Sequence, residues 1–443
     1  MLRRLARGIG ANAFGQFAGA VVQIAVLPIL VNKWGPAVYG VWALYFTVPS
    51  YLGLSDFGFA TAAATRMTIE AAQGDYAQAR TVYQSVWIVI LCITAFIGCL
   101  SATAVALAPD DIIANAFMSA SDARVILLLL LLYGLLLIPG GVLQAGFRSA
   151  GLYATGVMCN SITGLVEGAV VAGAVLAGGG LLEAAVAYLV CRLAGVFATW
   201  SILSSKAPWL WLGFREASRS EVEELFRPAI AVMPIPAAQT AFLQGTTLVL
   251  AMAGSTAAVT SFVAVRTMTR FITQAVGMVN HAILPEFSVV ATREDRKGLA
   301  FFVWGTIASS LAIATPAAIV FGLFGQHIVT LWTRGALEPS NELVLVLTAN
   351  ALVYALWQPL SNLLLAVNRQ AAYSYVYLAV ALMAVVGAYP MSLWMGNVGA
   401  GLATLMLELA MTAFVAPLIW RVFLLPSPVE FLKSSFHAGR SVG

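Results

Sequence analysis

The chain has 443 residues, of which 61% are apolar and only 9% are charged, and its mean hydropathy is +0.90. A soluble domain of this composition would expose large apolar patches, so a soluble enzyme is excluded and a lipid bilayer is the expected solvent. Backbone inside hydrocarbon must satisfy its own hydrogen bonds, and the apolar runs are longer than the roughly ten residues of a membrane strand. The sequence therefore predicts an all-α, polytopic membrane protein.

Apolar runs bounded by charge, glycine or proline predict about twelve transmembrane helices in two six-helix lobes. The predicted domains are an N-terminal lobe over 1–204, a cytoplasmic interfacial linker over 205–227, and a C-terminal lobe with a short cytoplasmic tail over 228–443. An even number of spans places both ends of the chain on one side. In chain order the predicted spans are 8–33, 37–64, 82–107, 124–149, 152–178, 181–204, 228–253, 256–284, 298–325, 342–368, 370–394 and 397–422.

Lysine and arginine are distributed unevenly between the predicted loops. Seventeen of the 23 lie on the side of the N-terminus and three on the other side, while Arg192, Arg266 and Arg270 fall inside predicted spans. Cationic loops are retained in the cytoplasm, so both termini are predicted to be cytoplasmic. The net charge of +4 then reflects topology, and we expect no nucleic acid as a partner.

Polar side chains recur in the first and seventh spans, which occupy equivalent places in the two lobes. Gln16 and Gln23 lie on one side of the first span with Asn12, and Gln239 and Gln244 cluster in the seventh. Two interpretations stay open. Either these amides line a hydrated cavity suited to sugars, or they form hydrogen bonds between helices, which contribute about 0.6 kcal/mol each. The four glutamines are candidate substrate-binding residues.

Asp56 lies in the second span and Arg66 follows ten residues later. An ionisable group in hydrocarbon costs on the order of 3 kcal/mol, so it requires a partner, water or a function. Asp56 and Arg66 are therefore candidates for coupling or gating, with Asp56 titrating protons or binding cations. The alternative role of Asp56 is a hydrogen-bonded brace at a closely packed turn that contains Gly58.

Glu167 in the fifth span and Arg192 in the sixth lie at nearly equal distances from the glycine turn at 178–180. An antiparallel hairpin brings them to the same depth, where burial of either one alone would be far more costly than burial of a pair. They are predicted to form a structural ion pair, and the alternative is a role in binding substrate. The nearby motif formed by Gly164 and Gly168 predicts a close approach of the same two helices.

Arg266 and Arg270 are spaced i, i+4 in the eighth span, so they share one face of the helix. On one interpretation they pair with Asp56 or Glu408, or extend toward the headgroups. On the other they form a cationic patch in a central cavity, where a guanidinium group can bind a phosphate or uronate through two hydrogen bonds. They are candidate substrate-binding residues.

Several catalytic and cofactor motifs are missing from the sequence. None of the four lysines ends a G-x-x-x-x-G-K-[ST] loop, and there is no H-E-x-x-H, C-x-x-C or G-x-S-x-G motif. The three histidines are far apart, and the four cysteines all lie within predicted spans. We therefore expect no enzymatic activity, no metal and no cofactor.

Five short segments near the N-terminus carry a resemblance to a known family. They are ANAFG at 11–15, LPIL at 27–30, WGPAVYG at 34–40, LSDFGF at 54–59 and TR at 65–66. Together they resemble the bacterial polysaccharide flippases of the multidrug/oligosaccharidyl-lipid/polysaccharide (MOP) exporter superfamily. The detailed likeness covers roughly the first seventy residues, and the remainder agrees in helix number and in the two-lobe arrangement.

The resemblance implies a two-lobe fold like that of the multidrug and toxin extrusion (MATE) exporters, and a function. The protein would flip undecaprenyl-pyrophosphate-linked oligosaccharide from the inner to the outer leaflet of the bacterial inner membrane, by alternating access, for exopolysaccharide or O-antigen biosynthesis. Its partners would be the lipid-linked oligosaccharide, membrane lipids, and the polysaccharide polymerase and chain-length machinery. The cargo headgroup would enter near Arg266 and Arg270.

Three other functions compete with this interpretation. A cation-coupled multidrug exporter of the same architecture is the strongest, although the charge expected in the cavity is cationic and only Asp56 supports it. A carrier of the major facilitator type would carry a G-x-x-x-D-R-x-G-R loop after the second span, which is missing here. A membrane glycosyltransferase or polymerase would need a larger outer loop than the segment at 109–124.

Overall fold

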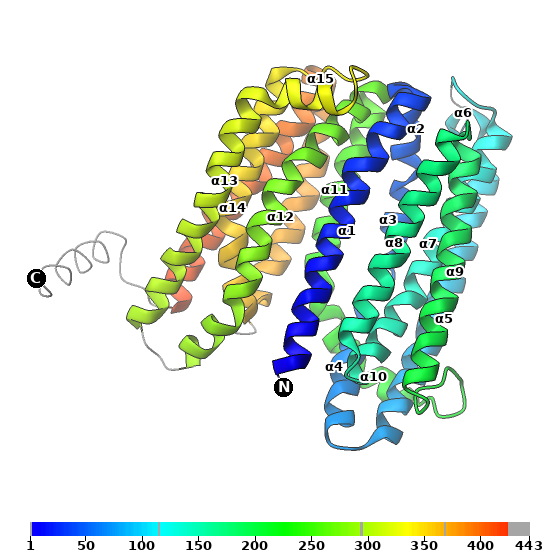
Figure 1. Cartoon of the computed structure of the whole chain (residues 1–443), viewed down its shortest axis with the longest axis vertical. Coiled ribbons are helices and arrows are strands. Elements are labelled where there is room, and N and C mark those ends of the chain that lie inside the picture. Colours follow the sequence, from blue (N-terminus) through cyan, green and yellow to red (C-terminus); the bar gives the residue numbers. More distant parts are fainter. Residues whose placement is uncertain (1, 114–115, 293–295, 367–368, 424–443) are drawn as a thin grey trace, which may run out of the picture. The chain divides into compact units, whose positions relative to one another are not determined.

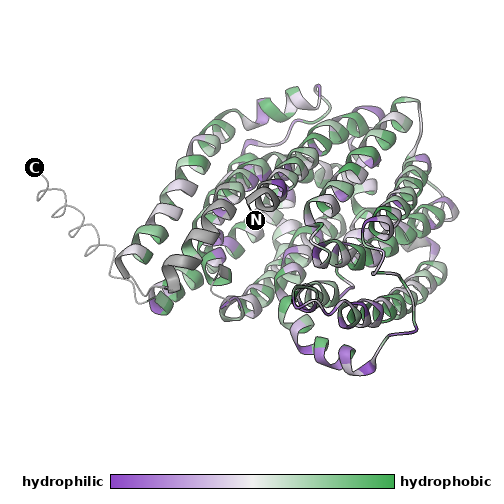
Figure 2. Ribbon diagram, turned by 60° about the horizontal axis from the view of Figure 1, so that its bottom comes forward, coloured by the Kyte–Doolittle hydropathy of each residue, from purple (hydrophilic) through white to green (hydrophobic). Residues whose placement is uncertain are grey.

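The computed structural model describes residues 2–113, 116–292, 296–366 and 369–423, and every regular element in these ranges is a helix (Figure 1). Eight of the helices are long and apolar enough to cross a membrane, and the last of them joins two predicted spans. Hydrophobic residues dominate these long helices, as the green ribbon of Figure 2 shows. The prediction of an all-α, polytopic membrane protein is confirmed.

The helices belong to two compact units. The first unit comprises Met1–Ala251, Ser255–Thr260 and Trp332–Ala336. Within it α1 packs along α8, and α7 packs against α4, α5 and α9. Its helices are α1 (Leu2–Trp34), α2 (Pro36–Tyr45), α3 (Thr47–Leu52), α4 (Phe59–Ala72), α5 (Tyr76–Leu107), α6 (Asp110–Ile113), α7 (Ala120–Ser149), α8 (Tyr153–Leu176), α9 (Leu181–Lys206), α10 (Arg219–Val232) and most of α11 (Pro234–Ala253).

The second predicted span is not one continuous helix. It is divided into α2, α3 and α4, with a turn at 53–58 in which Phe57 and Gly58 have φ angles of 48° and 81°. A Cβ atom on Gly58 would lie 2.4 Å from the carbonyl oxygen of Ala229 in α10. Glycine is required there because the backbone is left-handed and another helix backbone lies against it.

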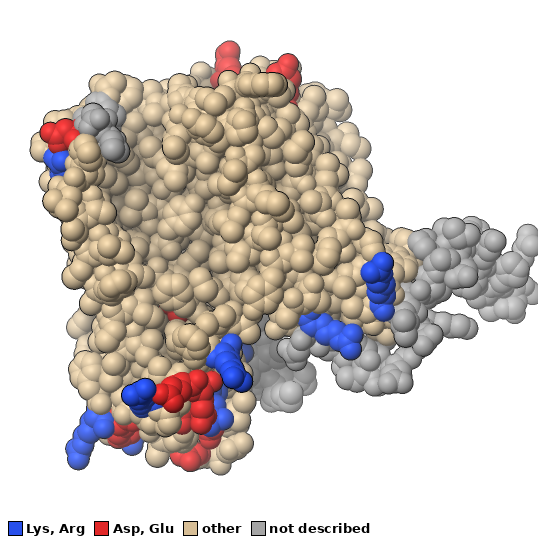
Figure 3. Space-filling model, turned by 180° about the vertical axis from the view of Figure 1, so that it is seen from behind, with Lys and Arg blue, Asp and Glu red and all other residues tan. Residues whose placement is uncertain are grey.

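The segment between α9 and α10 is docked on the N-terminal end of α5. Arg80 of α5 forms an ion pair with Glu216 at 2.5 Å, and its guanidinium lies 4.3 Å from the ring centroid of Trp211. The side-chain oxygen of Gln84 accepts a hydrogen bond from the backbone amide of Glu216 at 2.8 Å. On the face that Figure 3 shows, charged side chains gather mainly near the upper and lower edges, and most of the surface between them is uncharged.

The second unit comprises Met252–Gly254, Ser261–Leu331 and Leu337–Gly443. It contains most of α12 (Thr256–Thr292) and of α13 (Arg296–Trp332), with α14 (Asn341–Ala366) and α15 (Ala371–Phe423). The ribbon of α15 is two helices joined at Gly396, whose φ of 57° and ψ of −134° are not helical, so it accounts for two predicted spans. The two halves of α15 are packed with α14, and the lobe boundaries expected from the sequence stay a prediction.

Candidate functional site

Glu167 and Arg192 meet inside the first unit, between α8 and α9. Arg192 Nη2 lies 2.7 Å from Glu167 Oε2 and donates a hydrogen bond to it. The same nitrogen donates to the hydroxyl of Tyr133 in α7 at 3.2 Å, and that hydroxyl donates to Glu167 Oε2 at 3.4 Å. The charges therefore compensate each other, and the three helices are connected through one polar cluster. The functional role of this pair remains a prediction.

An aromatic cluster lies beside the ion pair. The ring of Tyr133 is 5.4 Å from that of Tyr188 and 5.9 Å from that of Phe46, and Tyr188 also stacks on Trp42 at 6.0 Å. Rings at these distances bury large apolar areas and exclude water. Aromatic side chains on the side of α2 and α9 consequently shield the ion pair from water.

Gly195 allows α8 and α9 to approach each other near the pair. A Cβ atom on Gly195 would lie 2.3 Å from a side-chain carbon of Thr163. The expectation that Gly164 and Gly168 serve this purpose is wrong. A Cβ atom on Gly168 would instead meet Val22 of α1 at 2.9 Å, and one on Gly164 would have no neighbouring atom within 4 Å. Small residues do permit the contact, but the rotation of the helix decides which neighbour each one meets.

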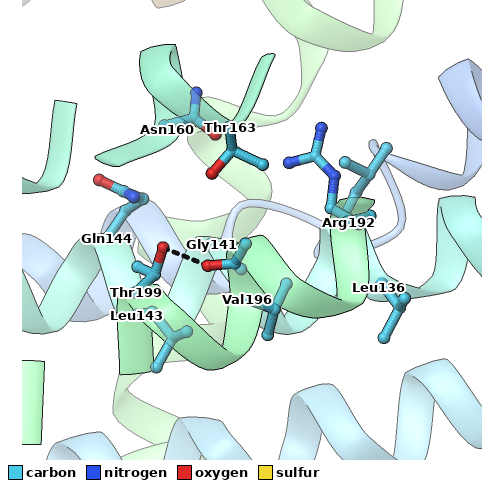
Figure 4. A pocket seen from close by; sticks show the side chains of 12 residues that line it. Leu136, Gly141, Leu143, Gln144, Asn160, Thr163, Arg192, Val196 and Thr199 are labelled. Atoms are coloured by element: carbon cyan, nitrogen blue, oxygen red, sulfur yellow. Dashed lines mark hydrogen bonds between the residues drawn. The ribbon is translucent and has the colours of Figure 1, made fainter. Parts of the chain in front are cut away.

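A pocket of about 240 Å³ lies between α7, α8 and α9, next to the ion pair (Figure 4). Its polar lining consists of Gln144, Asn160, Thr163, Arg192 and Thr199, and three leucines of α7 with Val196 of α9 supply apolar surface. Figure 4 shows Gln144 and Arg192 at opposite ends of the view, with the two threonines and Asn160 between them. This pocket was not predicted from the sequence. The sequence feature that could have indicated a polar site here is the helical spacing of Asn160, Thr163 and Glu167, which places them on one face of α8.

Asp56 and Arg66 lie apart from this cluster. Asp56 is half-buried, and its Oδ1 accepts a hydrogen bond from the amide of Gly58 at 3.1 Å, which stabilises the turn between α3 and α4. Arg66 in α4 forms ion pairs with Glu70 at 3.1 Å and with Glu224 of α10 at 3.6 Å. These contacts favour structural roles for both residues, and their coupling and gating roles remain predictions.

The four candidate glutamines all belong to the first unit. Gln16 and Gln239 are exposed, while Gln23 and Gln244 are half-buried. The Oε1 atom of Gln23 is buried and has no hydrogen-bond partner within the described part of the chain. Across the same residues no hydrogen bond joins the glutamines of α1 to those of α11, so their shared cavity stays a prediction.

Arg266 and Arg270 both lie on the part of α12 that belongs to the second unit. The guanidinium of Arg266 is 5.1 Å from the ring centroid of Phe262, one turn earlier on the helix. Arg270 is exposed and interacts electrostatically with Tyr354 of α14. Among the acidic side chains that the structure describes, none forms an ion pair with Arg270. Glu408, which belongs to the same unit and was suggested as a partner, is therefore not paired with Arg270.

Glu408 occupies a different polar site in the second unit. It is buried in α15, and its Oε2 accepts a hydrogen bond from Trp357 Nε1 of α14 at 2.6 Å. Tyr354 and Tyr377 lie close enough to interact with it electrostatically. Of the lysine and arginine side chains that the structure describes, none forms an ion pair with Glu408. From the sequence we considered this acid only as a partner for the arginines, although a lone acid in an apolar span was itself a signal.

Comparison with known proteins finds a family of polysaccharide biosynthesis proteins by sequence and a similar fold in solved transporters of the MOP superfamily. The sequence profile of the family described as "Polysaccharide biosynthesis protein" matches residues 5–290, more than half of the chain. A search of curated protein sequences finds no match. The inward-facing structure of a MATE-family multidrug resistance transporter of the MOP superfamily is 14% identical, with a TM-score of 0.75, and covers 90% of this chain and 98% of that one.

Two further solved structures have the same fold. The lipid II flippase MurJ in an inward closed conformation is 13% identical, with a TM-score of 0.67, over 96% of this chain and 89% of that one. The outward-facing MATE transporter is also 13% identical, with a TM-score of 0.65, over 95% of each chain. At this identity the likeness establishes the fold alone. With the family match, it confirms the resemblance to the MOP superfamily.

Proposed function

We propose that this chain, which belongs to the polysaccharide biosynthesis protein family, flips undecaprenyl-pyrophosphate-linked oligosaccharide between the leaflets of a bacterial cytoplasmic membrane. The movement runs from the inner to the outer leaflet by alternating access, with both termini in the cytoplasm. The protein is a transporter without catalytic activity, and the polysaccharide polymerase and chain-length machinery receive its product.

The observation that carries this proposal is the pair of arginines on one face of α12. Membrane-spanning segments rarely hold ionisable groups, and none of the acidic side chains described by the structure forms an ion pair with Arg270. A guanidinium group matches the geometry of phosphate oxygens and stays charged at every physiological pH. An anionic pyrophosphate headgroup is the cargo that such a pair would bind, whereas the lipid tail remains in the bilayer.

The first test uses cells that assemble a polysaccharide on an undecaprenyl carrier. Deletion of the gene should trap lipid-linked oligosaccharide on the inner leaflet, and the wild-type chain should restore its movement. We expect Arg270→Gln to reduce translocation at least about tenfold, because a hydrogen bond to a charged group contributes about 1.5 to 3 kcal/mol. Arg266→Gln should add to the loss.

The control is Arg148→Gln, which removes an exposed arginine at the end of α7 and should leave translocation unchanged. Arg270→Lys keeps the charge without the planar fork, so intermediate activity is expected. Wild-type translocation by the Arg266→Gln/Arg270→Gln double variant, at equal amounts in the membrane, would remove the basis of the cationic site.

The second candidate is a cation-coupled multidrug exporter, which the fold shared with MATE transporters favours. Such cargo is usually cationic or amphipathic, and two arginines would repel the cationic compounds. Accumulation of a cationic dye in cells that lack other exporters separates the two functions. Reduced dye accumulation on expression of the chain, with no effect on oligosaccharide translocation, would favour the exporter.

A further inference from the structure

The pocket between α7, α8 and α9 offers hydrogen-bonding groups of both kinds. Thr163 and Thr199 donate their hydroxyl protons to carbonyl oxygens of their own helices, at 2.9 Å and 2.7 Å, so their lone pairs are free to accept. The amides of Gln144 and Asn160 form no hydrogen bond with the described residues and provide both donors and acceptors. Arg192 Nε is buried, has no partner there, and adds a donor.

The pocket carries no net charge, although an arginine lines it. The 2.7 Å contact with Glu167 compensates the guanidinium of Arg192, and Glu167 is itself buried behind it. An anion entering the pocket would gain little from a charge that is already neutralised, and it would lose its hydration. The lining therefore favours a neutral ligand that both donates and accepts hydrogen bonds, as hydroxyl groups do.

The volume of the pocket and its apolar surface further restrict the class of ligand that it can bind. At about 240 Å³ the pocket is smaller than the roughly 300 to 1,000 Å³ of sites that hold drug-sized molecules. It is much larger than the roughly 10 to 15 Å³ that a cavity needs, on the same measure, to hold one water. Leucines of α7 and Val196 of α9 supply a surface for C–H groups. A single sugar ring combines this size with hydroxyls around its edge and apolar C–H faces.

We propose that this pocket binds one neutral sugar ring of the transported glycan, separately from the site at which α12 binds the charged headgroup. This inference rests on the proposed function, since the sugar belongs to the lipid-linked cargo. The exposed side chain of Asn160 marks the side from which a ring enters. Each lobe would then recognise a different part of the cargo, the sugar in the first unit and the pyrophosphate in the second.

Gly140 provides a way to fill the pocket without disturbing its walls. It lines the pocket, and a Cβ atom at this position would meet no other atom within 4 Å. Gly140→Leu should therefore occupy the space of the ring and lower oligosaccharide translocation at least about tenfold, the equivalent of 1.4 kcal/mol. Gly173→Leu is the matched control, because Gly173 in α8 has equally open surroundings but does not line the pocket.

Binding is measured directly on the full-length purified protein. The four native cysteines are replaced by alanine, Gly140→Cys is introduced, and the rate of maleimide labelling is followed with added methyl glycosides. A neutral glycoside at ten times its Kd should slow labelling about tenfold. The methyl glycoside of a uronic acid should protect less. Because this measurement needs no translocation, it separates failure of the pocket from failure of the proposed function.

The outcomes are decisive in both directions. Protection by neutral glycosides together with loss of translocation in Gly140→Leu supports the proposal. Equal labelling with and without every neutral glycoside, protection by the uronate alone, or wild-type translocation by Gly140→Leu would each overturn it. If Gly140→Leu does not fold, Thr163→Val and Thr199→Val replace it. Their control is Thr94→Val in α5, whose hydroxyl donates to the Ile90 carbonyl at 2.7 Å in the same way.

Discussion

Glu167 in the first unit and Glu408 in the second are buried to the same extent, with 3% of each residue exposed, but they have different partners. Glu167 contacts the guanidinium of Arg192 and the hydroxyl of Tyr133. Glu408 receives one hydrogen bond from Trp357 and lies among tyrosines. The charge of Glu167 is therefore compensated by a cation. Glu408 instead accepts its described hydrogen bond from a single neutral donor.

This difference distinguishes two roles of an acidic side chain inside the membrane, one in an ion pair and one without a cation. A buried ion pair connects its helices, because removing either partner leaves a charge with no compensation. A carboxyl group without a cation can be replaced by its amide without creating a new buried charge. Substitutions at the two glutamates should therefore have very different effects on stability.

The largest effect is expected for Glu167→Gln. The variant leaves the buried guanidinium of Arg192 without its counter-charge, so the free energy of unfolding should fall by about 3 to 5 kcal/mol. Denaturant titration of the purified protein in mixed micelles measures this change. The double variant Glu167→Gln/Arg192→Leu should recover most of the loss, and a loss below about 1 kcal/mol in the single variant would contradict the pairing.

A smaller effect is expected for Trp357→Phe. This change removes the indole N–H from Glu408 and leaves a buried carboxyl oxygen without its donor, which costs about 1 to 3 kcal/mol of unfolding free energy. A double-mutant cycle with Glu408→Leu isolates the hydrogen bond from the smaller ring volume. If the two changes are additive, the hydrogen bond contributes nothing to stability.

The smallest effect is expected for Glu408→Gln, because the amide oxygen can still accept from Trp357. The free energy of unfolding should change by less than about 1 kcal/mol, in contrast to the same substitution at Glu167. The same titration compares the two variants side by side. A loss as large as that of Glu167→Gln would show that a cation compensates Glu408 in the folded protein.

Much of the fold follows from hydropathy. Runs of apolar residues bounded by charge predict the membrane class and most of the helices, and equal distances from a glycine turn predict that Glu167 and Arg192 lie at one depth. The break in the second span was not predicted. It depends on the approach of α10 to Gly58, a contact between residues that are far apart in the chain.

The sequence by itself determined that this protein lies in a membrane, because the free energy of placing a helix in lipid is a sum over its own residues. Only the tertiary structure decided which polar groups share a site, such as the pocket beside Arg192 and the bond from Trp357 to Glu408. The physical reason is that a helix apolar on every side has no preferred rotation in its own sequence. Contacts with its neighbours, including the close one at Gly195, select the face that each helix presents.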